Sequence, residues 1–99
     1  NHELGLVSDD LVSEGEIGSV QVNIRKMLEI VIKNKCDIVV VTHNHPKGSD
    51  MPSKSDIQST RRIFNALANI NVQLADHIIV GMNGETSLRA AGMIPDIWS

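Results

Sequence analysis

The sequence predicts an α/β domain built on a mixed β-sheet. Strand-like and helix-like segments alternate along the 99 residues. A β-branched run over residues 37–42 has the composition of a buried strand. Apolar residues at helical spacing precede that run, and a helix with a capping signal follows it.

The first elements are expected before residue 35. Residues 4–12 form an early strand region, Gly15 and Gly18 indicate a turn, and residues 19–22 a short extended piece. A helix follows from an N-cap at Asn23 to about residue 34. Its apolar face comprises Ile24, Met27, Leu28 and Val31.

The central strand, residues 37–42, is continuously β-branched, which predicts coverage on both faces. A polar loop over residues 43–52 leads to Ser53 and Asp56, whose spacing resembles a capping box with Asp in place of Glu or Gln. This cap opens a helix to about Asn69. Its inward residues are expected to be Ile57, Phe64, Leu67 and Ala68.

Two further strands are expected over residues 72–75 and 77–82. Asn83-Gly84 indicates a hairpin turn into a strand over residues 86–88. The tail, which contains Pro95, is expected to end as a short helix and coil.

The bulk composition indicates one small domain. A hydrophobic content of 41% is enough for one modest core. The single Cys36 excludes an intrachain disulfide framework and a multi-cysteine zinc site, and its place before an apolar strand indicates a buried thiol. No apolar run approaches the ~20 residues of a membrane span, and the first residues do not resemble a signal peptide. A cytoplasmic location is therefore expected.

Charge and aromatic content disfavour direct contact with nucleic acid. Nine basic residues stand against twelve acidic ones, for a formal net charge of −3. Phe64 and Trp98 are the only aromatic residues besides histidine, so a base-stacking surface is nearly absent.

The residues that carry chemistry follow the central strand. His43 and His45, two residues apart in extended chain, point to the same side and can reach one metal ion. Asp56, in the first turn of the next helix, can add an oxygen ligand. Such a set leaves a fourth zinc position open, as in catalytic sites, where the metal activates water and polarises a carbonyl. Ser53 could hydrogen-bond a developing oxyanion.

Each of these residues also has a purely structural interpretation. A lone His-x-His is common, Ser53 and Asp56 suffice as a helix cap, and the loop could be an ordinary rigid turn. The combination at the end of a buried strand, where sites of α/β proteins form, favours a metal site.

The same string resembles a family signature. His-x-His, seven residues, Ser, two residues and Asp is the JAMM motif of the MPN/JAB metallohydrolases. The chain is similar to the RadC-like bacterial branch of this family over about residues 11–93. Three motifs carry the similarity: His-Asn-His-Pro-x-Gly, Pro-Ser-x-x-Asp and Asp-His-Ile-Ile-Val-Gly.

This resemblance implies an MPN (JAB)-like mixed sheet flanked by helices, similar to the cytidine-deaminase-like architecture. It implies His43, His45 and Asp56 as ligands of one Zn²⁺ ion, with Ser53 as the hydroxyl on the oxyanion side. The implied activity is zinc-dependent hydrolysis of peptide or isopeptide bonds, with a peptide or protein as substrate.

The sequence departs from the family pattern in two places. Alignment on Gly15 puts the family's general-base Glu before residue 1, so residues 1–99 are expected to form a single domain that lacks an N-terminal strand. Glu3 is the least implausible local substitute, whereas Glu14 and Glu16 flank a turn and are expected in solvent. Lys47 stands where the branch usually has Ser. An incomplete sheet would expose a strand edge, through which two copies could pair as a homo-oligomer.

Other interpretations stay open. His77 either orients a site residue or is a structural hydrogen-bonder, and the second reading is preferred. The missing Glu favours a non-catalytic scaffold or binding module, and the family's historical link with DNA repair suggests a role there without direct catalysis. His-Asn-His superficially resembles HNH nucleases, which the acidic balance disfavours. A zinc deaminase is excluded because its Pro-Cys-x-x-Cys ligands are absent.

Overall fold

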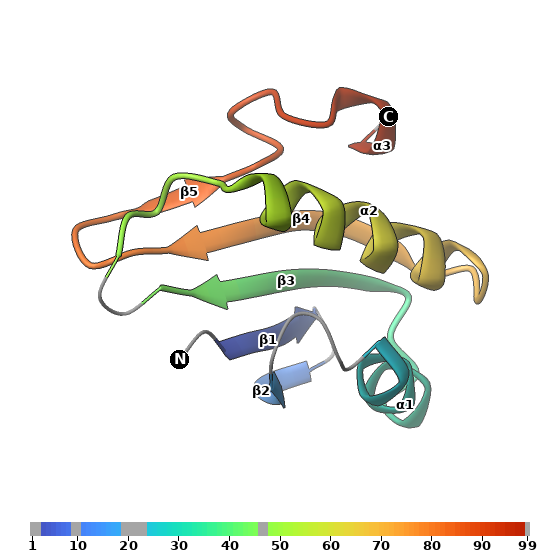
Figure 1. Cartoon of the computed structure of the whole chain (residues 1–99). Coiled ribbons are helices and arrows are strands. Elements are labelled where there is room, and N and C mark those ends of the chain that lie inside the picture. The colour runs from blue at the N-terminus through green and yellow to red at the C-terminus, as the bar shows by residue number, and fades with distance from the viewer. Residues whose placement is uncertain (1–2, 9–10, 19–23, 46–47, 99) are drawn as a thin grey trace.

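The computed structural model describes residues 3–8, 11–18, 24–45 and 48–98, the first two ranges as backbone (Figure 1). None of the helices in these ranges has the length and apolar character needed to cross a membrane. The elements are, in chain order, β1 (Glu3–Ser8), β2 (Leu11–Gly18), α1 (Ile24–Lys33), β3 (Ile38–Asn44), α2 (Lys54–Ala68), β4 (Gln73–Val80), β5 (Glu85–Ser87) and α3 (Pro95–Trp98).

Five strands form one mixed sheet in the order β2-β1-β3-β4-β5. β1 is antiparallel to both β2 and β3, and β5 is antiparallel to β4. β3 and β4 are parallel because α2 carries the chain back between them. The predicted class, an α/β fold with a mixed sheet flanked by helices, is confirmed. Edge-to-edge pairing of two copies through β2 or β5 stays a prediction.

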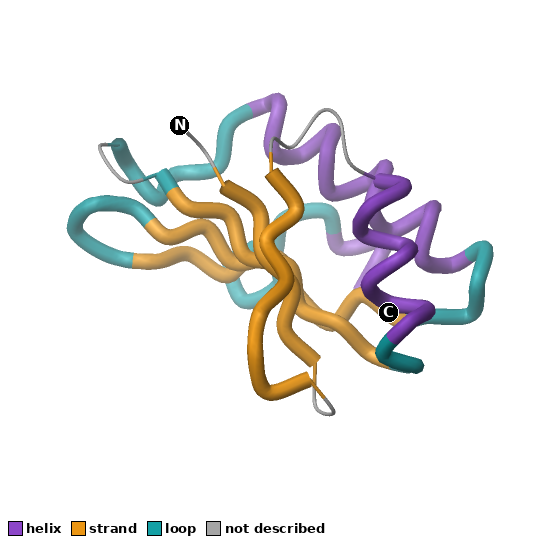
Figure 2. The backbone as a smooth tube through the Cα atoms, turned by 90° about the horizontal axis from the view of Figure 1, so that it is seen from below, coloured by secondary structure: helices purple, strands orange, loops and turns teal. Residues whose placement is uncertain are grey.

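The helices gather on one side of the strands (Figure 2). In β3 burial alternates: Val39 and Val41 are buried, Val40 is half-buried and Ile38 is exposed. The prediction that this strand is covered on both faces is therefore wrong. The β-branched composition fits strand geometry itself, whichever face is covered. The core residues from the two long helices and the two central strands are Met27, Val31, Ile63, Leu67, Val39, Val41, Leu74 and Ile79.

The N-terminal region differs from its prediction. The sequence predicts one strand region over residues 4–12, but its described residues belong to two antiparallel strands, 4–8 to β1 and 11–12 to β2. Gly15 and Gly18 lie within β2 and form no turn; Gly15 is opposite Leu6. The pairing has two register shifts, and glycine in a strand is typical of such irregularities. The predicted extended piece at 19–22 and the N-cap Asn23 lie outside the described residues.

The two long helices end close to their predicted limits. Ser53 caps α2 with a complete capping box, in which its side chain accepts from the Asp56 backbone and the Asp56 side chain accepts from the Ser53 backbone. Leu67 faces the core as predicted, whereas Ala68 is exposed. The prediction missed Ile63, which is four residues before Leu67 on the same buried face. In α1, Met27 and Val31 are buried as expected.

In the C-terminal third of the chain the predicted hairpin is confirmed, but the two strands predicted before it are one. β4 is a single strand where two were expected, and the pairing slips by one residue at Ala75, between Leu74 and Asp76. The turn at Asn83-Gly84 joins β4 to β5. The short helix α3 is held to α2 by two hydrogen bonds from the Arg61 guanidinium to the Asp96 carboxylate, at 2.7 and 3.2 Å.

We expect Leu67→Ala to lower the free energy of unfolding by about 2–5 kcal/mol, because the side chain is fully buried in the core and its removal leaves a cavity. Urea denaturation at neutral pH measures this change. Ile32→Ala is the matched control: Ile32 is 61% exposed on α1, and its truncation should change the free energy by less than about 0.5 kcal/mol. Equal effects of the two substitutions would contradict this core.

Candidate metal centre

Two histidines lie at the carboxyl end of β3. His43 is the penultimate residue of the strand, and His45 follows its last residue. Both are buried, with 3% and 8% of their surface exposed, while the intervening Asn44 is exposed. Extended backbone therefore turns both imidazoles to the same face. The rings meet edge to face, with centroids 4.4 Å apart.

Asp56, in the first turn of α2, brings a carboxylate to the two histidines. Its Oδ1 lies 2.8 Å from Nδ1 of His43 and 3.8 Å from Nε2 of His45. One ligand atom from each of the three residues lies within 4.8 Å of the others. Two ligands of one tetrahedral zinc ion are ~3.3 Å apart, given bonds of ~2.0–2.1 Å. These donor types, brought within 4.8 Å of one another, could hold a metal ion, and the three residues predicted as ligands come together.

The two oxygens of Asp56 have different tasks. Oδ2 accepts hydrogen bonds from the backbone N and the hydroxyl of Ser53, at 2.7 and 2.9 Å, and Oδ1 faces the histidines. Burial raises the pKa of the carboxyl, but the hydrogen bonds from Ser53 and the proximity of the two histidines outweigh it, and the pKa lies below its usual value. Asp56 is therefore a carboxylate at neutral pH.

The orientation of His45 is set by the loop that follows it. Nδ1 of His45 lies 3.0 Å from the carbonyl oxygen of Ser49. A carbonyl can only accept, so Nδ1 carries the proton and donates it, and Nε2 remains as the donor atom for a metal. This nitrogen is the one that faces Oδ1 of Asp56.

His77 is linked to the backbone of Asp56 through Thr60. The Thr60 hydroxyl donates to the carbonyl oxygen of Asp56 at 2.7 Å, and Nδ1 of His77 lies 2.6 Å from the same hydroxyl. The hydroxyl has one hydrogen, so Nδ1 of His77 must donate to it. His77 is therefore a structural hydrogen-bonder, as preferred, and it also supports the residue that bears the carboxylate.

Burial and the nearby His43 lower the pKa of His77 to about 4, so its imidazole is neutral at pH 7.

Asp76, which the motif Asp-His-Ile-Ile places beside His77, has a structural role. One oxygen accepts from the backbone N of His77 and from that of Arg89, and the other accepts from the hydroxyl of Ser87. These bonds fix the turn after β5 against β4. Asp76 thus lies outside the set of metal-binding atoms.

The remaining candidates are placed by the backbone alone or not at all. In the β1–β3 pairing Glu3 is opposite Asn44, and Leu4 is opposite His43. Opposed residues of antiparallel strands share a face, so the Glu3 position falls on the face of Asn44. Glu14 and Glu16 belong to β2. Lys47 lies outside the described residues.

Sequence reasoning missed Thr60 and Ser49 as supporting residues. Thr60 follows Asp56 by four residues, and this helical spacing was available as a signal. Ser49 acts through its main-chain carbonyl, for which a sequence carries no signal.

The fold and this site define an α/β domain with a buried His, His, Asp cluster that could hold a metal ion. Comparison with known proteins identifies the family. The family model described as RadC-like JAB domain matches residues 1–93. The chain belongs to this family.

Among its relatives, a UPF0758 protein of Symbiobacterium thermophilum is 34% identical over 90% of this chain and 38% of its own length. A UPF0758 protein of Neisseria meningitidis serogroup C is 33% identical over 96% of this chain and 42% of its own length. The chain thus spans about two fifths of these relatives. Their names state no activity.

We expect the metal-free chain to lose stability as the pH falls from 6.5 to about 4, since unfolded His77 takes up a proton that the folded state excludes. The single-site slope is at most about 1.4 kcal/mol per pH unit. His77→Asn keeps a donor near Nδ1 and removes the titrating group, so its stability should depend less on pH over this interval. Urea denaturation across the range measures both proteins, and identical pH dependence would contradict the buried neutral imidazole.

Proposed function

We propose that the chain carries a one-zinc metallohydrolase site that cleaves peptide or isopeptide bonds. The observation that carries this proposal is the convergence of two buried imidazoles and one buried carboxylate, whose ligand atoms all lie within 4.8 Å of one another. Membership of a JAB family supports the hypothesis that the site is hydrolytic.

The residues of the chain would divide the work. His43, His45 and Asp56 would hold the ion. When bound, zinc acts as a Lewis acid that polarises a carbonyl and makes water a better nucleophile. Ser49 fixes the tautomer of His45, and the link from His77 through Thr60 holds the backbone of Asp56.

Ser53 has two parts in this proposal. Its hydroxyl donates to Asp56, which turns the other carboxylate oxygen toward the metal space. We assign the same hydroxyl to the oxyanion side of the reaction, where it would exchange its intramolecular partner for the substrate oxygen.

The second candidate is a metal-binding module without hydrolytic activity. The register of β1 favours it, because the Glu3 position shares a face with Asn44 and not with His43. Hydrolysis needs a group that removes a proton from the attacking water. The assignment of Glu3 as that base stays a prediction.

The proposed substrate is a peptide or protein in the cytoplasm. A net charge of −3 and two aromatic residues besides histidine argue against direct contact with nucleic acid by these residues. A DNA-repair association would then act through a protein partner.

The metal site is tested by zinc content. Purified chain should hold about one zinc ion per molecule, and Asp56→Asn should lose most of it because an amide oxygen is a weaker ligand than a carboxylate. Asp37→Asn makes the same chemical change at an exposed position beside the other end of β3 and should keep its zinc. Elemental analysis after dialysis measures all three. Wild type without zinc would reject the proposal.

Hydrolysis is tested separately on a peptide library. A hydrolase should release new amino termini, lose that activity on dialysis against a chelator and regain it with zinc. Zinc-loaded chain that cleaves no peptide would leave the metal-binding module as the function. If the chain binds DNA with an affinity that falls as salt is added, the argument against direct contact with nucleic acid is wrong.

A further inference from the structure

The β4–β5 hairpin and the segment of residues 48–50 approach each other more closely than a side chain would allow. Gly81, directly after β4, is the point of contact. A Cβ atom added there would lie closest to the backbone N of Asp50, 2.8 Å from the carbonyl carbon of Ser49 and 2.9 Å from the carbonyl oxygen of Gly48. All three neighbours are backbone atoms, so any side chain at Gly81 must displace the segment or the hairpin.

Hydrogen bonds on either side of Gly81 join the hairpin to His45 and to the first residue of the segment, Gly48. The backbone N of His45 donates to the carbonyl of Val80 at 2.7 Å, and the backbone N of Met82 donates to the carbonyl of Gly48 at 2.9 Å. The side chains add one more bond, from the Thr86 hydroxyl to a carboxylate oxygen of Asp50 at 2.6 Å. The segment is thereby fixed at both ends to one hairpin.

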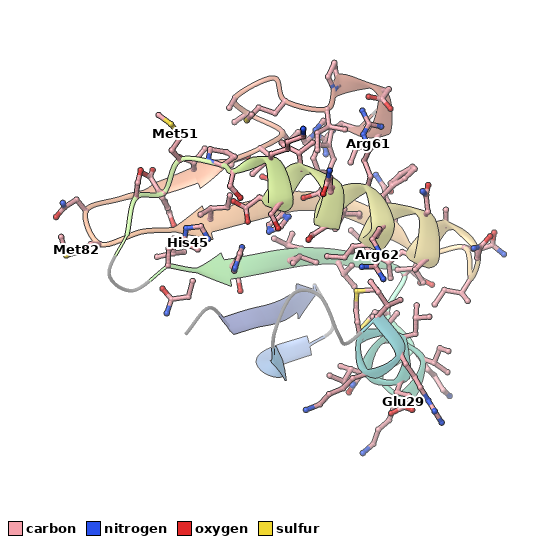
Figure 3. The ribbon with its side chains drawn as sticks, viewed as in Figure 1. Glu29, His45, Met51, Arg61, Arg62 and Met82 are labelled. Atoms are coloured by element: carbon pink, nitrogen blue, oxygen red, sulfur yellow. The ribbon has the colours of Figure 1, made fainter. Side chains whose placement is uncertain are left out.

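Ser49 lies in the middle of this fixed segment, and its carbonyl oxygen is the acceptor for Nδ1 of His45. A shift of the segment would move this acceptor away from the ring. His45 would then lose both the preference for its Nδ1–H tautomer and the restraint on its ring orientation. Figure 3 shows His45 at the end of the sheet where Met51, after the segment, and Met82, on the hairpin, also lie.

We propose that the β4–β5 hairpin positions His45 for metal binding, with Gly81 and Thr86 as positioning residues that contact no ligand atom. The inference rests on the proposed metal site and adds to it a source of metal affinity on a different pair of strands. Supporting residues of this kind change metal affinity by about 10–100-fold in other proteins. The main-chain carbonyl of Ser49 carries the effect, because it is the acceptor for Nδ1 of His45.

The first test compares Gly81→Ala with Gly84→Ala in the full chain. A Cβ at Gly84 would meet only the Asp50 carboxylate at 3.7 Å, an ordinary contact, so this variant makes the same change in the same hairpin. Gly81→Ala should bind zinc about tenfold more weakly or worse and alter the visible spectrum of the cobalt-substituted protein. Gly84→Ala should match wild type in both. Competition with a chromophoric chelator measures the affinity, and Gly81→Ala equal to wild type would overturn the proposal.

A second pair covers the case in which Gly81→Ala fails to fold. Thr86→Val removes the hydroxyl that reaches Asp50, and Thr86→Ser keeps it. The Val variant should lose about threefold to tenfold in zinc affinity, and the Ser variant should retain it. Loss in both variants, or in neither, would overturn the role of this bond.

A measurement on metal-free protein can test this inference even if the proposed function is wrong. The ring ¹⁵N shifts of His45 in metal-free protein at pH 7.5 report its tautomer. Wild type should show the Nδ1–H form, and Gly81→Ala and Thr86→Val should show a mixture. If wild type binds no zinc, the proposed function fails, and the ¹⁵N shifts still decide the inference: unchanged shifts in both variants would overturn it.

Discussion

The site depends on the Asp56 carboxylate, whose two oxygens contact different partners. Oδ2 of Asp56 completes the capping box of α2, and Oδ1 faces the two histidines. The first turn of a helix presents unsatisfied N–H groups and the positive end of its dipole, both of which favour an anion there. The interaction that starts the helix therefore also keeps the Asp56 carboxylate charged and turns its Oδ1 toward the histidines.

The site is continuous with the core. Along the buried face of β3, Val39 and Val41 are followed by His43, and along α2, Leu67 and Ile63 give way to Thr60 and Asp56. The parallel β3–α2–β4 connection brings the carboxyl end of β3 to the amino end of α2, where ligands of α/β proteins bind. The polar residues at the end of β3 and at the start of α2 therefore lie side by side and stay buried.

Buried polar groups destabilise a fold unless they have partners, and the partners here come from several elements. His45 uses the carbonyl of Ser49, His77 uses Thr60, and Asp56 uses Ser53. The hairpin of β4 and β5 enters this arrangement through Gly81, where the absence of a Cβ allows two backbones to touch. The surroundings of His45 therefore include β4 and β5 as well as β3, the strand that it follows.

The local sequence determined the helices at 24–33 and 54–68, the central strand, the hairpin at Asn83-Gly84 and the three ligand candidates, because each rests on spacing or on short-range chemistry. It misplaced Gly15 in a turn and split β4, since strand pairing and its irregularities depend on partners far along the chain. It also left open which residues support the ligands. Only the tertiary structure decided that Thr60 holds Asp56 and that the backbone beside Gly81 holds the acceptor of His45, because both depend on contacts between segments brought together by the sheet.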